Sequence, residues 1–286
     1  MRPLLTLIGA PYHLGRRGLG VGAGPLDLLS ADALPAALGS TGHDVELEWL
    51  DDPSAGHEVG DVFELNRALA ARVSAVRERS RLPVIASGNC ALCLGAIGGL
   101  TASKPGVVWF DAHADFHTPE TTESGFLDGM GLAAATGACW TSLCATIPGF
   151  EPVAERDSVL VGVHDVDPGE RERLDAGEIT AIEAAGPGSL ALTDLERAVD
   201  AIAGRVGGVY LHLDLDAIDP SLGVANEHTT EGGLGLDDVG AAVAAVAERT
   251  PVLAVALTGY DPGADPERRF ERTAVEVATT TLEAVS

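Results

Sequence analysis

Five carboxylate and imidazole side chains gather in two short clusters, each at the point where an apolar run ends. The clusters follow the runs 106–110 and 209–213, and their members are Asp111, His113, Asp115, Asp214 and Asp216. In extended backbone, residues i, i+2 and i+4 lie on one face, so the members of each cluster can converge. Groups packed this closely would repel one another or lose their charge unless divalent cations compensate them. The two clusters therefore predict a pair of metal ions.

A purely structural role is the alternative for either cluster taken alone. A single Asp-x-Asp after a strand is commonly a turn or a helix cap, because Asp is favoured in both. Here two clusters close strongly hydrophobic runs in one chain, and the second continues into Asp219-Pro220. This combination favours metal binding over capping.

The elements that must position these clusters alternate between strand and helix. Apolar runs predict eight strands, at 4–9, 45–50, 84–87, 107–110, 158–163, 179–182, 209–213 and 252–257. Helix-like stretches lie between or after them, at 58–80, 189–204 and 266–286. This order favours an α/β fold with a mostly parallel sheet covered on both faces, whose functional loops gather at the carboxyl ends of the strands. No linker or repeat divides the chain, so residues 1–286 are predicted to form one domain.

Composition narrows the class of protein. The formal net charge is −25, from 43 acidic and 18 basic residues, which argues against nucleic acid as a partner. The four cysteines are too few and too central for a disulfide scaffold and indicate a reducing cytoplasm. The apolar opening, 1–9, is too short to span a bilayer and lacks a convincing cleavage site, so we interpret it as the first strand and expect no membrane partner.

Three motifs of the chain resemble those of the arginase, agmatinase and formiminoglutamase superfamily, the ureohydrolases. They are DAHADFHTP at 111–119, DLDAIDP at 214–220 and SGNC at 87–90. The resemblance extends over nearly the whole chain, through 162–170, 232–234 and 261–262. It implies a three-layer α/β/α sandwich with an eight-stranded, mostly parallel sheet. It also implies a binuclear site, usually of manganese, that activates a bridging hydroxide, and a homo-oligomer, commonly a trimer or hexamer.

The resemblance also implies roles for the metal ligands. Asp111 and Asp214 would bridge both ions, Asp115 would complete the set of the first ion, and His113 with Asp216 would complete that of the second. Cys90 stands where the family motif GGDHS supplies a histidine ligand. A thiolate there would make Zn²⁺, Fe²⁺ or Co²⁺ more competitive with Mn²⁺; the alternative is a free buried cysteine replacing a lost ligand.

In having a cysteine at this position, the chain is similar to the variant arginases that hydrolyse Nω-hydroxy-L-arginine. The stretch 115–130 is closer to that group than to liver-type arginase. This similarity favours a modified guanidine as the substrate.

The substrate-binding end matches the arginase pattern in part. By resemblance, Asp165, Asp167 and Glu170 would hold the α-ammonium group of an amino acid, and Ser124 keeps a contact to its carboxylate. His117 replaces the asparagine that meets the same carboxylate; it either donates a hydrogen bond there or only packs.

Two departures fall near the reacting carbon. The family's proton-shuttling histidine aligns with Asp128, and the glutamate that pairs with the guanidinium aligns with Gly259. Asp128 or Glu231 would replace the lost carboxylate, or both are solvated loop residues. Asp128, Asp216 and His113 are the catalytic candidates.

Two further histidines carry open alternatives. His212 is either a hydrogen-bond donor behind the metal ligands or an ordinary core residue. His228, in the polar loop 226–230, either lines the pocket or lies on the surface.

The sequence thus predicts a cytoplasmic binuclear metallohydrolase that cleaves a linear C–N bond in an amino acid bearing a guanidino, hydroxyguanidino or formimino group. Agmatinase or formiminoglutamase activity is the alternative within the superfamily. A noncatalytic protein that keeps the fold to bind a metabolite or a partner is the alternative outside it.

Overall fold

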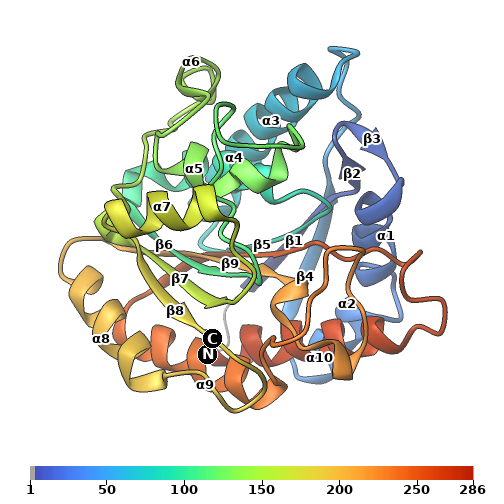
Figure 1. Cartoon of the computed structure of the whole chain (residues 1–286). Coiled ribbons are helices and arrows are strands. Elements are labelled where there is room, and N and C mark those ends of the chain that lie inside the picture. The colour runs from blue at the N-terminus through green and yellow to red at the C-terminus, as the bar shows by residue number, and fades with distance from the viewer. Residues whose placement is uncertain (1–3, 286) are drawn as a thin grey trace.

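One parallel sheet of eight strands forms the middle of the molecule (Figure 1). A computed structural model describes residues 4–285; Met1–Pro3 and Ser286, at the outer ends of the first predicted strand and the last predicted helix, lie outside the described residues. The strands, in spatial order, are β4 (Asp44–Trp49), β1 (Leu4–Ala10), β5 (Leu82–Ser87), β10 (Val252–Thr258), β9 (Gly208–Asp214), β6 (Pro105–Phe110), β7 (Ser158–Val163) and β8 (Thr180–Glu183). The predicted α/β class and eight-stranded sheet are confirmed.

Helices cover both faces of this sheet and complete three layers (Figure 1). One layer contains α3 (Glu58–Glu78), α4 (Cys93–Leu100), α5 (Gly131–Ala135), α6 (Thr141–Cys144) and α7 (Pro168–Ala176). The other contains α1 (Gly24–Leu28), α2 (Leu34–Ser40), α8 (Leu192–Ala203), α9 (Leu236–Arg249) and α10 (Arg269–Ala284).

The sheet divides the hydrophobic core into two. Along β6, Val107 and Trp109 pack into one core cluster, and Val108 and Phe110 pack into the other. This alternation follows from the two-residue period of a strand. Because helices cover both faces, the central strands are mostly apolar, and this is why their positions could be predicted from the sequence.

The order of the strands decides which loops meet. β9 lies between β6 and β10, and the register pairs Phe110 with Leu213 and Thr258 with Asp214. The residues that follow these three parallel strands therefore emerge at the same edge of the sheet. Both predicted acidic clusters begin there.

Element boundaries differ from the prediction by a few residues. The helix predicted at 189–204 spans 192–203, and the one predicted at 58–80 ends at Glu78. Two further short strands were not predicted: Arg16–Arg17 (β3) pairs with Tyr12–His13 (β2) in a short antiparallel hairpin. Its turn, Leu14-Gly15, has φ of 49° and 82°. This short connection requires positive φ angles, which glycine adopts readily.

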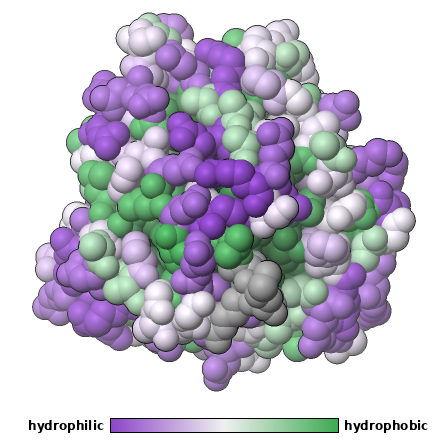
Figure 2. All heavy atoms as spheres, turned by 180° about the vertical axis from the view of Figure 1, so that it is seen from behind, coloured by the Kyte–Doolittle hydropathy of each residue, from purple (hydrophilic) through white to green (hydrophobic). Residues whose placement is uncertain are grey.

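The surface is mixed in polarity. Figure 2 shows hydrophilic side chains at the periphery of one face and also across its middle, with apolar ones beside the central group. The exposed large hydrophobic side chains among residues 4–285 are Leu19, Leu26, Leu47 and Val224. Within the same residues, every helix is too short or too polar to cross a membrane.

Candidate metal centre

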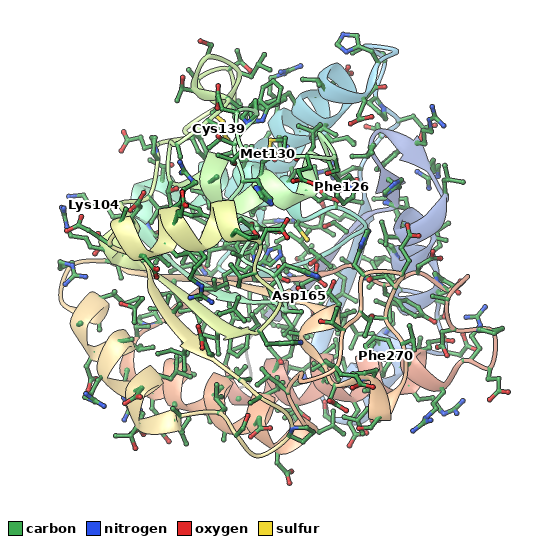
Figure 3. All side chains as sticks on the ribbon, viewed as in Figure 1. Lys104, Phe126, Met130, Cys139, Asp165 and Phe270 are labelled. Atoms are coloured by element: carbon green, nitrogen blue, oxygen red, sulfur yellow. The ribbon has the colours of Figure 1, made fainter. Side chains whose placement is uncertain are left out.

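A cavity of about 270 Å³ opens at the edge of the sheet where β6, β9 and β10 end. Its lining includes all six predicted metal ligands, which are Cys90, Asp111, His113, Asp115, Asp214 and Asp216. Side chains from loops far apart in the sequence also line it, among them Phe126 and Asp165 (Figure 3). The structure thus brings both acidic clusters and the cysteine together at one site.

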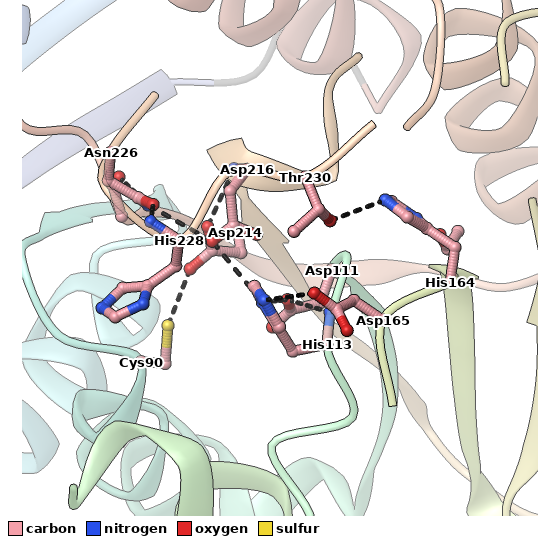
Figure 4. A network of polar contacts seen from close by, with 12 residues as sticks. Cys90, Asp111, His113, His164, Asp165, Asp214, Asp216, Asn226, His228 and Thr230 are labelled. Atoms are coloured by element: carbon pink, nitrogen blue, oxygen red, sulfur yellow. Dashed lines mark hydrogen bonds and ion pairs between the residues drawn. The ribbon is translucent and has the colours of Figure 1, made fainter. Parts of the chain in front are cut away.

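The six side chains, together with His212, form overlapping groups that could each hold an ion. Within residues 4–285, potential ligand atoms lie within 4.8 Å of one another in the groups Cys90–Asp111–Asp115, Cys90–His212–Asp214 and Asp111–His113–Asp216. Figure 4 shows several of these residues with their polar contacts. Two buried oxygens, Asp115 Oδ2 and Asp216 Oδ1, have no hydrogen-bond partner. Orphaned buried carboxylate oxygens are costly, and divalent cations would satisfy them, so the donor set fits two such ions.

Burial and mutual repulsion govern the ionisation of this cluster. Burial, reinforced by the charge of Asp216, raises the pKa of Asp111 to about 6. Burial and neighbouring carboxylates also raise the pKa values of Asp115 and Asp214 well above their usual range. For His113, burial lowers the pKa, but contacts with Asp111 and Asp216 outweigh it and raise the pKa overall. The surroundings therefore do not compensate the charge of all these carboxylates, which favours their protonated forms; bound cations would reverse this preference.

Cys90 lies against the carboxylate of Asp214. Its Sγ is 2.8 Å from Asp214 Oδ2 and 3.5 Å from Thr258 Oγ1. Burial, followed by the charge of Asp214, raises the pKa of the thiol well above its usual value. In this environment the thiol acts as a hydrogen-bond donor to Asp214, and a cation would have to displace its proton to bind sulfur.

A buried chain of hydrogen bonds supports Asp214 from behind. Thr258 Oγ1 lies 2.9 Å from Asp214 Oδ2 and 3.2 Å from His212 Nε2, and His212 Nδ1 lies 2.9 Å from the hydroxyl of Tyr210. If the Thr258 hydroxyl donates to the carboxylate, it accepts from His212 Nε2–H, and Nδ1 then accepts from Tyr210. Burial lowers the pKa of His212 to about 3, which keeps the ring neutral. The ring also stacks on Trp109, with 3.5 Å between centroids.

His212 thus combines the two roles that the sequence left open. It is fully buried in the core, and it is connected to Asp214 through one hydroxyl group.

Asp128 is buried and contacts the residues on either side of Cys90. It accepts hydrogen bonds from the side-chain amide of Asn89 and, at 3.1 Å, from the backbone N–H of Ala91, the two residues on either side of Cys90. Burial raises the pKa of Asp128 to about 6, although both hydrogen bonds act in the opposite direction. It is therefore no solvated loop residue. Glu231, in contrast, is exposed and lies beside Asp219 and Gly232 in a separate depression.

Most of the predicted substrate-binding residues also reach the cavity. His117, Asp165, Asp167 and Glu170 line it, whereas Ser124 is exposed and outside the lining. His117 Nε2 lies 3.1 Å from Asp167 Oδ2 and 3.7 Å from Glu170 Oε2. Asp167 and Glu170 are placed by α7, since they form the capping box at its first turn.

Gly259 lies where β10 ends, and no other residue fits there. Its φ is +79°, and a Cβ would lie 2.3 Å from Asp214 Oδ1. The backbone therefore passes directly against a predicted metal ligand, and no side chain can project into the cavity at this position.

Comparison with known proteins identifies the family. Residues 4–285 match the Arginase family. An arginase from Bacillus caldovelox is 31% identical over 96% of this chain and 96% of that protein, and the arginase of Bacillus subtilis is 26% identical over 99% and 98%. The chain belongs to the Arginase family.

Solved structures of this family share the fold. A structure of Bacillus subtilis arginase superposes with a TM-score of 0.87 at 26% identity, covering 98% of each chain. Bacillus caldovelox arginase gives 0.86 at 27% identity, again covering 98% of each. Formimidoylglutamase from Bacillus subtilis gives 0.74 at 16% identity, over 99% of this chain and 88% of the other, which is evidence for the fold alone. The resemblance inferred from the motifs is confirmed.

Several residues of this Arginase-family cavity were missed by the sequence analysis. Asn226 is buried, and its Nδ2 donates to Asp216 Oδ2 at 3.2 Å and to the carbonyl of Gly259 at 2.6 Å. His13, Phe126 and Glu227 also line the cavity. His13 lies in β2 and the other three lie in loops, and no local sequence pattern gave any of them a role. His228, whose location was left open, lines the cavity and is also exposed.

The hydroxyl of Thr258 gives a first test of the buried chain. Thr258→Val should lower the free energy of unfolding by about 1–3 kcal/mol, because the Nε2–H of His212 would remain buried without an acceptor. Urea denaturation of the metal-free protein measures this, with Thr258→Ser as the control that keeps the hydroxyl. Equal stability of the Val and Ser variants would contradict the hydrogen-bond assignment.

The contacts of Asp128 on either side of Cys90 give a second test. Asp128→Ala should lower the free energy of unfolding by about 1–3 kcal/mol, because the buried N–H of Ala91 would lose its acceptor. Asp175→Ala, an exposed change on α7, should alter it by less than about 0.5 kcal/mol. If the two variants unfold at the same urea concentration, Asp128 does not hold the loop.

Proposed function

We propose that the protein is a binuclear metal-dependent hydrolase that cleaves a linear C–N bond in an amino acid bearing a guanidino, hydroxyguanidino or formimino group, and releases urea or a urea-like product. The observation that carries this proposal is the convergence of two buried acidic clusters, with two orphaned carboxylate oxygens, in one cavity at the carboxyl edge of the sheet. Relatives named arginase, similar over 96% or more of this chain, support the reaction class.

Cys90, Asp111, His113, Asp115, Asp214 and Asp216 would hold the two ions. When bound, two divalent ions lower the pKa of a shared water and polarise the group it attacks. The predominance of carboxylates supports Mn²⁺ as the native metal, and Cys90 makes Zn²⁺, Fe²⁺ or Co²⁺ more competitive.

The chain's own residues would bind and orient the substrate. Asp165, Asp167 and Glu170 offer negative charge to an α-ammonium group, and His117, which lies between Asp167 and Glu170, can donate a hydrogen bond to a carboxylate. Ser124 would contact the same carboxylate, and Glu231 the guanidinium, only if their exposed loops turn toward the cavity. Substrate selection at this end therefore rests mainly on the capped turn of α7.

Proton transfer is assigned to Asp128, with His113 and Asp216 beside the reacting atoms. Asp128 lines the cavity, and each of its oxygens keeps a second lone pair that can take up a proton. Its raised pKa, caused by burial, suits an acid–base group.

The negative net charge of the chain supports a small-molecule substrate over nucleic acid. The four cysteines are free and buried, which supports a cytoplasmic location. The relatives' family supports a homo-oligomer, a trimer or hexamer.

Two observations favour a second candidate function, the binding of a metabolite without turnover. Gly259 offers no side chain to the substrate, and Cys90 replaces a harder ligand. Agmatinase or formiminoglutamase activity would fit the same metal site with a different substrate end.

Turnover over a substrate panel tests the proposal. The Mn²⁺-loaded protein should release urea or hydroxyurea, or hydrolyse the formimino group, with at least one of arginine, hydroxyarginine, agmatine, guanidinobutyrate and formiminoglutamate. Asp111→Ala or Asp214→Ala should lower turnover at least about 100-fold and reduce the bound metal below two ions per chain. Asp175→Ala should leave both unchanged. Less than one ion per natural chain, with no hydrolysis, would favour the second candidate.

The metal preference of Cys90 can be measured separately. Cys90→His should lower the ratio of Zn²⁺ to Mn²⁺ affinity by about 10-fold, because an imidazole is a harder ligand than a thiolate. Competition dialysis measures the ratio, and Cys93→Ser, a change at a neighbouring buried cysteine, is the control. A ratio that is the same in the His variant and the natural protein would show that sulfur does not bind metal.

A further inference from the structure

One part of the cavity wall is aromatic and has no role in the function proposed above. His13, Phe126 and His228 line the cavity in succession, and we call these three residues the aromatic arc. Ring centroids are 6.0 Å apart between His13 and Phe126 and 5.8 Å apart between Phe126 and His228. His228 in turn meets the ring of His113 edge-on at 6.4 Å (Figure 4). The arc therefore leads to the predicted metal ligands.

Core packing does not account for Phe126. The ring is half-buried, and it belongs to none of the hydrophobic core clusters formed by residues 4–285. Its ring neighbours are two histidines that are distant in the sequence, His13 of β2 and His228 of the loop 226–230. A phenyl ring held in this way offers part of its surface to whatever occupies the cavity.

Negative charge and an unused polar atom accompany the arc. Glu227 and Asp261 line the same cavity, and both lie near enough to His13 to act on its charge. Nδ1 of His13 is buried and has no hydrogen-bond partner. A bound group that is both planar and positively charged would satisfy these features together, because cations are attracted to aromatic faces and to carboxylates.

The strand end beside the arc provides no alternative contact. At Gly259 a side chain is excluded by the carboxylate of Asp214, so this position cannot contribute a side chain to the edge of a planar group. The arc is a cavity wall that can contact such a group by its face.

We propose that the aromatic arc binds the planar cationic end group of the substrate, a guanidinium or amidinium, by its face, with Glu227 and Asp261 supplying the compensating charge. The identity of the ligand as the substrate's end group rests on the proposed function. The binding preference for a planar cation follows from the arc alone.

Two probes of the same shape separate charge from size. Butylguanidinium is a planar cation, and butylurea is its neutral counterpart. Isothermal titration calorimetry on the Mn²⁺-loaded protein gives the ratio of their affinities, and the natural protein should bind the cation more tightly. Phe126→Leu should lower this ratio by about 3- to 10-fold, the range expected for the loss of a cation–π contact.

Conservative and distant variants make the result specific. Phe126→Tyr keeps an aromatic face and should retain the ratio, whereas Glu227→Gln should lower it by about 2-fold or more. Phe150→Leu changes an aromatic residue outside the cavity lining and should leave the ratio unchanged.

Three outcomes would overturn the proposal: the natural protein binds neither probe, it binds both equally, or a folded Phe126→Leu protein keeps its full preference. The first two remove the cation site, and the third removes the aromatic contribution to it. Binding is measured without turnover, so a protein that prefers the cation but hydrolyses no substrate would refute the hydrolase and leave the arc supported.

Discussion

The structure depends on one electrostatic constraint, the burial of several carboxyl groups at the ends of adjacent parallel strands. Asp111 and Asp214 follow strands whose register places Phe110 beside Leu213. The parallel pairing of the two strands fixes these side chains close to each other, and both are nearly inaccessible to solvent. Their raised pKa values express the free-energy cost of charging them in that position. Divalent cations are the compensation that this arrangement of oxygens fits best.

Neutral hydrogen-bond donors hold the carboxyl groups from behind without adding charge. Trp109 Nε1 donates to Asp111 Oδ2 at 2.9 Å, and Asn226 donates to Asp216. Asp214 receives the hydroxyl of Thr258, which His212 supports from the core. A permanently charged partner such as an arginine would compete with bound metal for the same oxygens, whereas His113 can lose its proton when metal binds. Neutral donors instead orient the carboxylates and leave their remaining lone pairs available.

The sequence predicted those parts of the structure whose cause is local. Strands buried on both faces are mostly apolar, so β6 and β9 could be predicted, and the carboxylates at their ends had a recognisable spacing. Asn226 and Phe126 were missed because their roles arise from contacts between loops that are distant in the chain. Ser124 was assigned to the substrate by resemblance, and Glu231 was a candidate to replace the lost carboxylate; the structure places both outside the cavity lining.

Gly259 shows how a single backbone position can decide which residues contact the substrate's reacting group. The backbone that follows β10 approaches Asp214 so closely that a Cβ at position 259 is excluded. One close approach therefore explains both why the end of β10 contacts this carboxylate and why position 259 has no side chain. An enzyme of this family that brings its strand so close to the metal ligands must recognise the reacting group from elsewhere. In this chain the neighbouring loops supply aromatic rings at that place, and rings hold a planar cation by its face and leave its N–H edges free. The acidic turn of α7 and the aromatic arc would then bind the two ends of one substrate, with the metal ligands beneath the arc.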